Sequence, residues 1–355
     1  MQLDHLAPEL LLHIFRSCDT VADVLHLAAT NRRLRHVFST SQKLSILVRA
    51  AEVEFGPLDD IIQLVTQNAS QPAHLTRGAS MSDALLKQIV EVGRVAQKWE
   101  AIYPLKKWKV DYVNRRLLTD EERYRLRRAV YRLWLYHRAF HNRLYDRFSR
   151  RIRTVVVERA QLLHNWSTEE LAEIEDLRLV IQDVVQNHIC PSNGTIQRKF
   201  RKRYPDNTQP LSFNIHLNYQ NNLSTSSYFR IERNATTEFY TAHPTNPSAK
   251  SAATYNSRLR MDLFHDPGQE GWGDEIPHYY VVQDMLKLDP AQVLWLRENA
   301  PLREHVENYI QSLGEWFRNN GETFGDTLLW VLNERGEDPE ELRVAIEEGR
   351  MGIAV

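Results

Sequence analysis

The sequence of 355 residues lacks most of the features that would assign it to a chemical class at first reading. Its two cysteines, Cys18 and Cys190, are too few for a disulfide framework. No run approaches the roughly 20 apolar residues that cross a membrane, and no basic segment followed by an apolar core predicts a signal peptide. A net charge of -1 gives no overall attraction to nucleic acid or to a membrane surface. We therefore expect a cytoplasmic or nuclear protein without a membrane partner.

The sequence also lacks the short motifs of common enzyme classes: GxxxxGK[ST], GxGxxG after a strand, HExxH and GxSxG. His137 and His141 stand one helical turn apart, as metal ligands can, but no acidic or cysteine ligand stands near them in sequence. We expect these histidines to pack or to form hydrogen bonds. His188 and Cys190 are too close in sequence to face one another as a base and a nucleophile. We therefore expect no catalytic centre, no metal and no cofactor.

What the sequence does contain is a succession of helix signals. Apolar residues recur every three to four positions, and no internal repeat of 20–50 residues is present, which argues against a solenoid or a propeller. Two capping boxes and two Asp–Pro pairs mark helix starts: Thr119 with Glu122, Ser167 with Glu170, Asp289–Pro290 and Asp338–Pro339. The expected fold class is all-α.

The most persistent helix pattern covers residues 120–148. One apolar face steps by three and four through Leu126, Val130, Leu133, His137, Phe140, Leu144 and Phe148. Further apolar residues widen this face, so we expect the helix to be central to the core.

Residues 190–261 are rich in Asn, Ser, Thr and Pro, and we expect a loop-rich insertion there, partly disordered. Strict alternation at 211–219 predicts a strand, with 227–232 as a candidate partner, so that the insertion can hold one β-hairpin. The basic run RKFRKR at 198–203 is expected to be a solvated loop, and a nuclear import signal is the alternative.

Charge is segregated along the chain. Residues 91–160 contain 19 Lys and Arg against 8 Asp and Glu, whereas residues 262–355 contain 7 against 20. Opposite charges attract over a Debye length of about 8–10 Å, and the C-terminal part also has apolar residues at helical spacing. We therefore predict four parts: 1–45, a helical domain at 46–189, the insertion at 190–261, and an acidic helical segment at 262–355 that docks on 46–189.

The N-terminal segment is apolar enough to be a core helix. In LAPELLLHIF, residues 6–15, Pro8 suits a first helical position. Thr20 with Asp23 predicts the cap of a second helix, and NRRLRHVF at 31–38 predicts a third. An exposed apolar patch flanked by charge is typical of a surface that binds another protein.

Residues 6–38 resemble the F-box, a trio of short helices. The F-box begins Leu-Pro-x-Glu-(Leu/Ile), continues through Ile-Phe/Leu and Asp-(Leu/Val)-Leu-x-Leu, and ends on an arginine-rich turn. The positions that match in order and spacing are Leu6, Pro8, Glu9, Leu10, Leu11, Ile14, Phe15, Asp23, Val24, Leu25, Leu27, Arg32, Arg33 and Leu34. Ala7 replaces the usual proline, and Leu34 stands where many members have tryptophan. The segment is most similar to F-box proteins of filamentous fungi.

The resemblance implies a partner and a function. In F-box proteins these helices bind a Skp-type adaptor, which connects them to the cullin of a cullin–RING (SCF-type) ubiquitin ligase, and the rest of the chain recruits a protein substrate. By this resemblance, 1–45 is the F-box, and Leu10, Leu11, Ile14 and Phe15 form the dry centre of the interface. The implied partner-binding residues are Leu6, Pro8, Leu10, Leu11, Ile14, Phe15, Val24, Leu25, Leu27, Arg32 and Leu34. The remainder shows no leucine-rich or WD repeats, and the substrate stays unknown.

Two alternatives remain open. The chain can act as a scaffold on the adaptor alone, without recruiting cullin. The basic residues of 91–160 can instead bind nucleic acid, although the aromatic residues interleaved there favour burial over stacking on bases. We expect no nucleic-acid partner.

Overall fold

The computed structural model describes residues 6–39, 42–203, 271–273 and 275–355. Within these residues every regular element is helical, so the fold class is all-α, as predicted. The strand patterns expected inside the loop-rich insertion lie outside the described residues.

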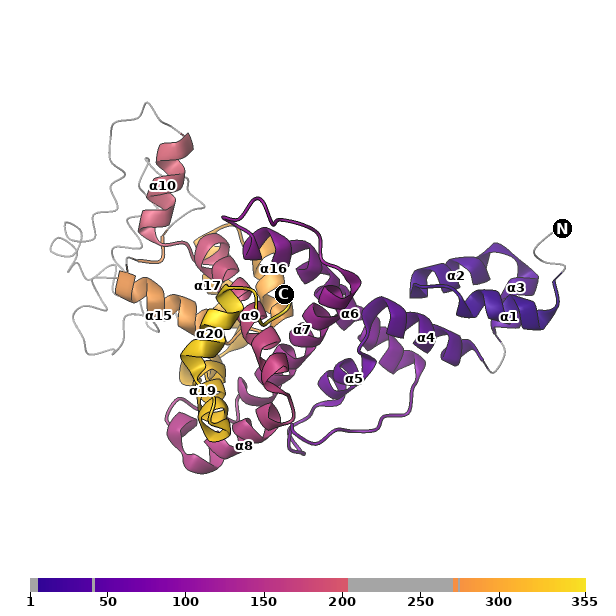
Figure 1. Cartoon of the computed structure of the whole chain (residues 1–355), viewed down its shortest axis with the longest axis horizontal. Coiled ribbons are helices and arrows are strands. Elements are labelled where there is room, and N and C mark those ends of the chain that lie inside the picture. The colour runs from indigo at the N-terminus through magenta and orange to yellow at the C-terminus, as the bar shows by residue number, and fades with distance from the viewer. Residues whose placement is uncertain (1–5, 40–41, 204–270, 274) are drawn as a thin grey trace. The chain divides into compact units, whose positions relative to one another are not determined.

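The first helices follow one another closely along the chain (Figure 1). Their bounds, with a 3₁₀ turn η2 and a π-helical turn η3, are α1 Pro8–Arg16, α2 Val21–Thr30, α3 Arg32–Phe38, α4 Lys43–Phe55, α5 Leu58–Thr66, α6 Asp83–Lys107, α7 Asp120–Phe140, η2 Ser149–Arg151, α8 Arg153–His164, α9 Thr168–Val184, η3 Val185–Ile189 and α10 Asn193–Arg203. After residue 270 the helices are α15 Glu275–Met285, α16 Pro290–Asn299, α17 Arg303–Leu313, α18 Trp316–Asn319, α19 Phe324–Arg335 and α20 Pro339–Glu347.

The predicted helix starts are confirmed by hydrogen bonds. The Thr119 N–H donates to Glu122 Oε2 (2.8 Å) and the Glu122 N–H donates to Thr119 Oγ1 (3.3 Å), which closes the capping box of α7. At the start of α9, the Ser167 N–H donates to Glu170 Oε2 (3.0 Å) and the Glu170 N–H donates to Ser167 Oγ (3.3 Å). The helices α16 and α20 begin at the predicted prolines, and the aspartate before each proline accepts a backbone N–H. Local chemistry therefore decides where these helices begin.

The end of α7 was predicted wrongly, because the helix ends at Phe140 and not at 148. The side-chain amide of Asn320 donates to the carbonyls of Phe140 (3.1 Å) and Asn142 (3.2 Å). The Asn142 side chain in turn accepts the N–H of Leu144 (2.9 Å). These bonds satisfy groups that a longer helix would have paired internally. As a result, Leu144 and Phe148 are not core residues but are exposed.

The basic run at 198–203 was also predicted wrongly as a loop. It forms the last turns of α10. The Ser192 hydroxyl accepts the N–H of Thr195 (3.1 Å) and so caps this helix. Lys199 donates to the carbonyl of Asn187 (3.0 Å), so one cation of the run contacts the preceding helical turn.

The chain divides into two compact units. Unit 1 comprises Met1–Ala139, Gln161–Leu177 and Leu332–Val355, and unit 2 comprises Phe140–Ala160 and Arg178–Val331. Each unit therefore combines residues of the basic middle with residues of the acidic C-terminal part. The four-part division made from the sequence stays a prediction.

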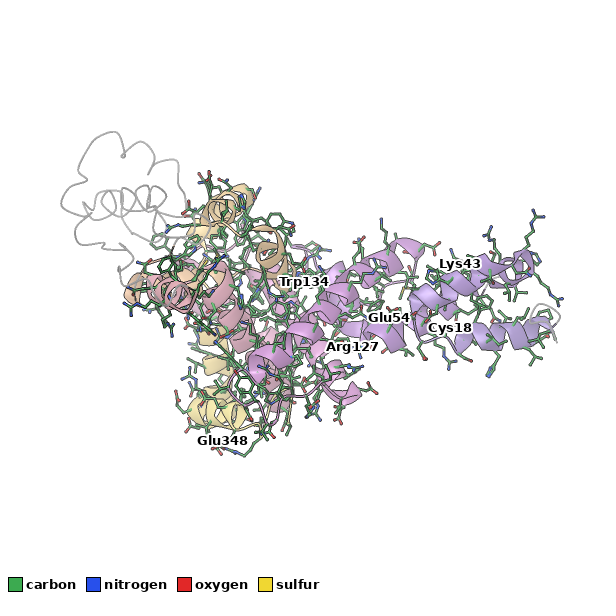
Figure 2. All side chains as sticks on the ribbon, turned by 90° about the horizontal axis from the view of Figure 1, so that it is seen from above. Cys18, Lys43, Glu54, Arg127, Trp134 and Glu348 are labelled. Carbon is green, nitrogen blue, oxygen red and sulfur yellow. The ribbon has the colours of Figure 1, made fainter. Side chains whose placement is uncertain are left out.

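In unit 1, α4 connects the N-terminal helices to the rest of the unit. It contacts α1 and α2, which precede it in the chain, and α5 and α6, which follow it. A Cβ on Gly93 of α6 would lie 2.3 Å from the Phe55 ring, so only glycine allows Phe55 to pack there. The Tyr131 hydroxyl donates to the Phe55 carbonyl (2.7 Å), and Arg127 of α7 donates to the carbonyl of Glu54 (Figure 2). The C-terminal end of α4 is thus bound to both α6 and α7.

The C-terminal residues of unit 1 are held by polar contacts. Lys107 at the end of α6 donates to Asp176 (2.9 Å) and to the carbonyl of Ile346 (3.0 Å). The Ile353 N–H also donates to Asp176 (3.1 Å). The segment after α19 is therefore bonded to residues of α6 and α9.

In unit 2, buried ion pairs lie among the apolar residues. Arg303 pairs with Glu307 (2.7 Å), donates to the carbonyl of Gly271 (2.7 Å), and lies 4.5 Å from the Trp272 ring centre. Because Arg303 and Glu307 are both buried, removing either one would leave the charge of the other less well compensated.

Candidate partner-binding surface

The helix α1 carries apolar residues on more than one side. Leu11 and Phe15, four residues apart, are 0% exposed, whereas Leu10 is 53% exposed and Ile14 is half-buried. Pro8 is the first residue of the helix, where its missing N–H costs no hydrogen bond. Leu11 and Phe15 therefore belong to the core of the N-terminal helices, whereas the side chain of Leu10 is exposed to solvent.

The helices α2 and α3 complete this local core. The Phe15 and Phe38 rings lie 5.4 Å apart, and Val24 and Leu34 are buried beside other apolar residues. Thr20 caps α2 by accepting the N–H of Asp23 (3.0 Å). Leu25 of α2 remains 47% exposed.

The Arg33 guanidinium and the Cys18 thiol are two polar groups in this part of the chain whose surroundings affect their chemistry. The Arg33 guanidinium donates to the carbonyl of Leu6 (2.8 Å), which ties α3 to the residue before α1. Burial raises the pKa of the Cys18 thiol, and the nearby carboxylates of Asp23 and Asp19 raise it further. Cys18 is thus a poor nucleophile at neutral pH.

The structure sorts the eleven implied partner-binding residues by exposure. The exposed ones are Pro8, Leu10, Leu25 and Arg32, the half-buried ones Leu6, Ile14 and Leu27, and the buried ones Leu11, Phe15, Val24 and Leu34. The buried set packs the N-terminal helices together. Of the four residues expected at a dry interface centre, Leu10 is the one whose side chain is mostly available to another molecule. Contact of any of them with a partner stays a prediction.

The residues considered from the sequence as metal ligands or as a base and nucleophile include His141, His188 and Cys190. His141 Nε2 lies 3.2 Å from Thr323 Oγ1, and both residues are buried. Cys190 is fully buried, and burial raises the pKa of its thiol well above the ordinary value, whereas His188 is exposed. Within the described parts of the chain, no group of three or more His, Cys, Asp or Glu is placed to hold a metal ion.

Much of the positive charge of α7 is used inside unit 1. Arg128 pairs with Glu173 (2.6 Å) and Glu170 (3.1 Å). Arg132 pairs with Asp60 (3.1 Å) and Glu170 (2.9 Å). Cations held by carboxylates in this way contribute little to the field that attracts nucleic acid. This arrangement does not favour the alternative of a nucleic-acid-binding middle.

The likeness to the F-box depends on the sequence of residues 6–38 alone. In the portion of the chain that the structure covers, no helix is both long and apolar enough to span a membrane. Comparison of the chain with known protein families, with curated proteins and with solved structures found no match.

Proposed function

We propose that the chain is an F-box protein whose helices α1–α3 bind a Skp-type adaptor and whose remaining part recruits a protein substrate to a cullin–RING ubiquitin ligase. The proposal is supported by the positions that match the F-box pattern in order and by the formation of three short helices over the same residues. In such an assembly the chemistry of ubiquitin transfer belongs to other subunits, and this chain contributes positioning.

The observation that carries the proposal is the division of apolar residues within the motif. Leu11 and Phe15 build a core inside the N-terminal helices, whereas Leu10 and Leu25 are 53% and 47% exposed. Folding of these helices alone does not require exposed leucines at both positions, and exposed apolar side chains are typical of a binding surface. A stable protein interface would bury on the order of 1,200–2,000 Å² in total.

We expect the double variant Leu10→Asp/Leu25→Asp to lose the adaptor. Each aspartate would place an unpaired charge in an apolar interface, and a total cost of about 3 kcal/mol corresponds to roughly a hundredfold weaker binding. The measurement is co-purification of a Skp-type adaptor with the full chain, followed by titration calorimetry with the purified proteins.

A matched control separates this surface from a general effect of charge. Leu75 and Leu105 of unit 1 are 50% and 54% exposed, so Leu75→Asp/Leu105→Asp changes comparable side chains outside α1–α3. This control should bind adaptor as the unchanged chain does. Adaptor binding at full strength by Leu10→Asp/Leu25→Asp, with an unchanged circular dichroism spectrum, would contradict the proposal. Phe15→Ala is a poorer test, because Phe15 is fully buried and its truncation would disrupt the helices themselves.

The same purification distinguishes a ligase subunit from a scaffold. A ligase subunit brings cullin with the adaptor, and both disappear in Leu10→Asp/Leu25→Asp. A scaffold brings the adaptor without cullin.

A further inference from the structure

Residues 142–153 of unit 2, which we name the arginine–apolar segment, expose three apolar side chains spaced four residues apart. Leu144 is 66% exposed, Phe148 is 94% exposed and Ile152 is 52% exposed. The sequence places the first two in the core of a long helix, but the helix ends before them. Large apolar side chains exposed within one short segment are typical of a binding site for another molecule.

The segment is held in place by hydrogen bonds and ion pairs. The Ser149 N–H donates to the Asp146 carboxylate (2.6 Å), and the Tyr145 hydroxyl donates to Glu158 Oε1 (2.9 Å). Arg147 and Arg150 add ion pairs with Asp284 (3.0 Å) and Asp326 (2.6 Å). Because these contacts fix the segment, a partner would pay little conformational entropy to meet its apolar side chains.

The other arginines of the segment differ from these two. The exposed ones that form no ion pair within the described residues are Arg143, Arg151 and Arg153. A guanidinium group presents a planar set of donors that matches a carboxylate, and such pairs are stronger and more directional than pairs made by lysine. The segment thus combines three apolar side chains with three cations that have no carboxylate in the described chain.

We propose that the arginine–apolar segment binds an acidic segment of a partner protein. Carboxylates of the partner pair with Arg143, Arg151 and Arg153, and its apolar side chains pack against Phe148 and its two aliphatic neighbours. This surface belongs to unit 2 and does not depend on adaptor binding by α1–α3.

The surroundings favour a protein over a polyanion. Carboxylates of Asp146, Glu158, Asp284 and Asp326 contact side chains or backbone of the segment or of its immediate neighbours, so its positive charge is interrupted. Nucleic acid and anionic membranes attract surfaces of continuous positive charge. Two of the three apolar side chains are aliphatic and offer no ring on which a base could stack.

The test uses the full chain and fluorescent synthetic peptides, with binding measured by fluorescence anisotropy. One peptide pool mixes Asp and Glu with Leu and Phe; a second replaces the acids by lysine, and a third replaces the apolar residues by serine. We expect the acidic–apolar pool to bind most tightly, and both replacements to weaken binding by about tenfold or more.

Paired variants assign the binding to the segment. Arg143→Glu/Arg151→Glu/Arg153→Glu should weaken binding of the acidic–apolar pool by about tenfold or more, and Phe148→Ser should do so independently. The matched controls are Arg35→Glu/Arg49→Glu/Arg94→Glu, which reverses three exposed arginines of unit 1, and Val113→Ser, whose side chain is 93% exposed. Both controls, and Leu10→Asp/Leu25→Asp, should bind the pool normally.

The proposal is overturned if the acidic–apolar pool does not bind, or if it binds the segment variants and the controls equally. It is also overturned if single-stranded RNA or phosphatidylserine vesicles bind the full chain more tightly than the pool does and the triple reversal abolishes that binding. In that case the segment would be a site for polyanions.

Discussion

Replacing Asp176 by alanine is expected to lower the free energy of unfolding of unit 1 by about 3–5 kcal/mol. The Asp176 side chain is only 2% exposed. It accepts hydrogen bonds from the Tyr103 hydroxyl (2.5 Å), the Lys107 ammonium group (2.9 Å) and the Ile353 N–H (3.1 Å). Alanine would leave all three donors without this acceptor, and buried donors that lose their partner pay their full cost of desolvation.

The effect is measured by urea denaturation of the full chain. Tyr103→Phe provides the comparison, because it removes one donor and leaves the carboxylate bonded to Lys107 and Ile353; we expect it to cost about 1 kcal/mol. The double variant Asp176→Ala/Tyr103→Phe should lose less unfolding free energy than the two single variants lose together. The reason is that both substitutions remove the same hydrogen bond. A loss below 1 kcal/mol for Asp176→Ala would show that these contacts do not stabilise the unit.

Asp176→Ala should also loosen residues 350–355. Because Ile353 is bonded to Asp176 and Lys107 donates to the carbonyl of Ile346, the last residues depend on this carboxylate. We expect the backbone amides of residues 350–355 to exchange hydrogen faster in Asp176→Ala than in the unchanged chain, under conditions in which both are folded.

Such contacts explain why the sequence predicts helices better than it predicts their ends and partners. The capping boxes at Thr119 and Ser167 involve residues three positions apart, so a short window of sequence contains all the necessary groups. The end of α7 depends on Asn320, which is 180 positions away from the Phe140 carbonyl that it bonds. No local pattern contains that information, and the apolar spacing continues undisturbed through Phe148.

For the candidate partner-binding surface too, the sequence predicts the helices and their apolar residues but not their packing. Helical spacing shows that α1 has an apolar face, and the F-box pattern names its residues. It does not show which of these residues are used by the protein itself. Leu10 and Leu11 are adjacent and chemically identical, yet one is 53% exposed and the other is 0% exposed, because only Leu11 faces the helices that follow. Exposure, and therefore availability to a partner, is a property of tertiary packing.

The second large effect is expected at Lys287 in unit 2. Its side chain is 0% exposed and its ammonium group donates to the carbonyls of Phe317 (2.5 Å) and Asn320 (2.8 Å). Asp284 lies 3.3 Å away. Lys287→Met fills most of the same space but removes the donor, leaving two carbonyls and a mostly buried carboxylate with less compensation. We expect a loss of about 3–5 kcal/mol in the free energy of unfolding, measured by urea denaturation at pH 7.

Asp284→Asn tests whether the ion pair or the carbonyl contacts dominate this loss. Arg147 still pairs with Asp284 in Lys287→Met. If loss of the Lys287 charge beside this carboxylate is the main cost, Lys287→Met/Asp284→Asn should be more stable than Lys287→Met. Equal stability of the two variants would assign the cost to the carbonyls of Phe317 and Asn320, and would contradict a major role for the ion pair.

The stability that Lys287 contributes should also depend on pH in a specific direction. Burial lowers its pKa to about 8 in the folded protein, from 10.5 for an ordinary lysine, although Asp284 acts in the opposite sense. Between these two values the unfolded chain binds more protons than the folded chain, so the contribution of Lys287 to stability rises with pH. Below pH 8 both states are protonated and the contribution is constant.

The difference in unfolding free energy between the unchanged chain and Lys287→Met isolates this group, because other alkaline titrations are common to both proteins. Measured by urea denaturation, the difference should be flat from pH 6 to about pH 7.5 and should grow from pH 8 to pH 10. An ordinary surface ion pair would behave in the opposite way, since deprotonation of its lysine at high pH would remove the attraction. A difference that stays constant or falls between pH 8 and pH 10 would therefore show that Asp284 and the two carbonyls stabilise the charged form of Lys287 more than burial disfavours it.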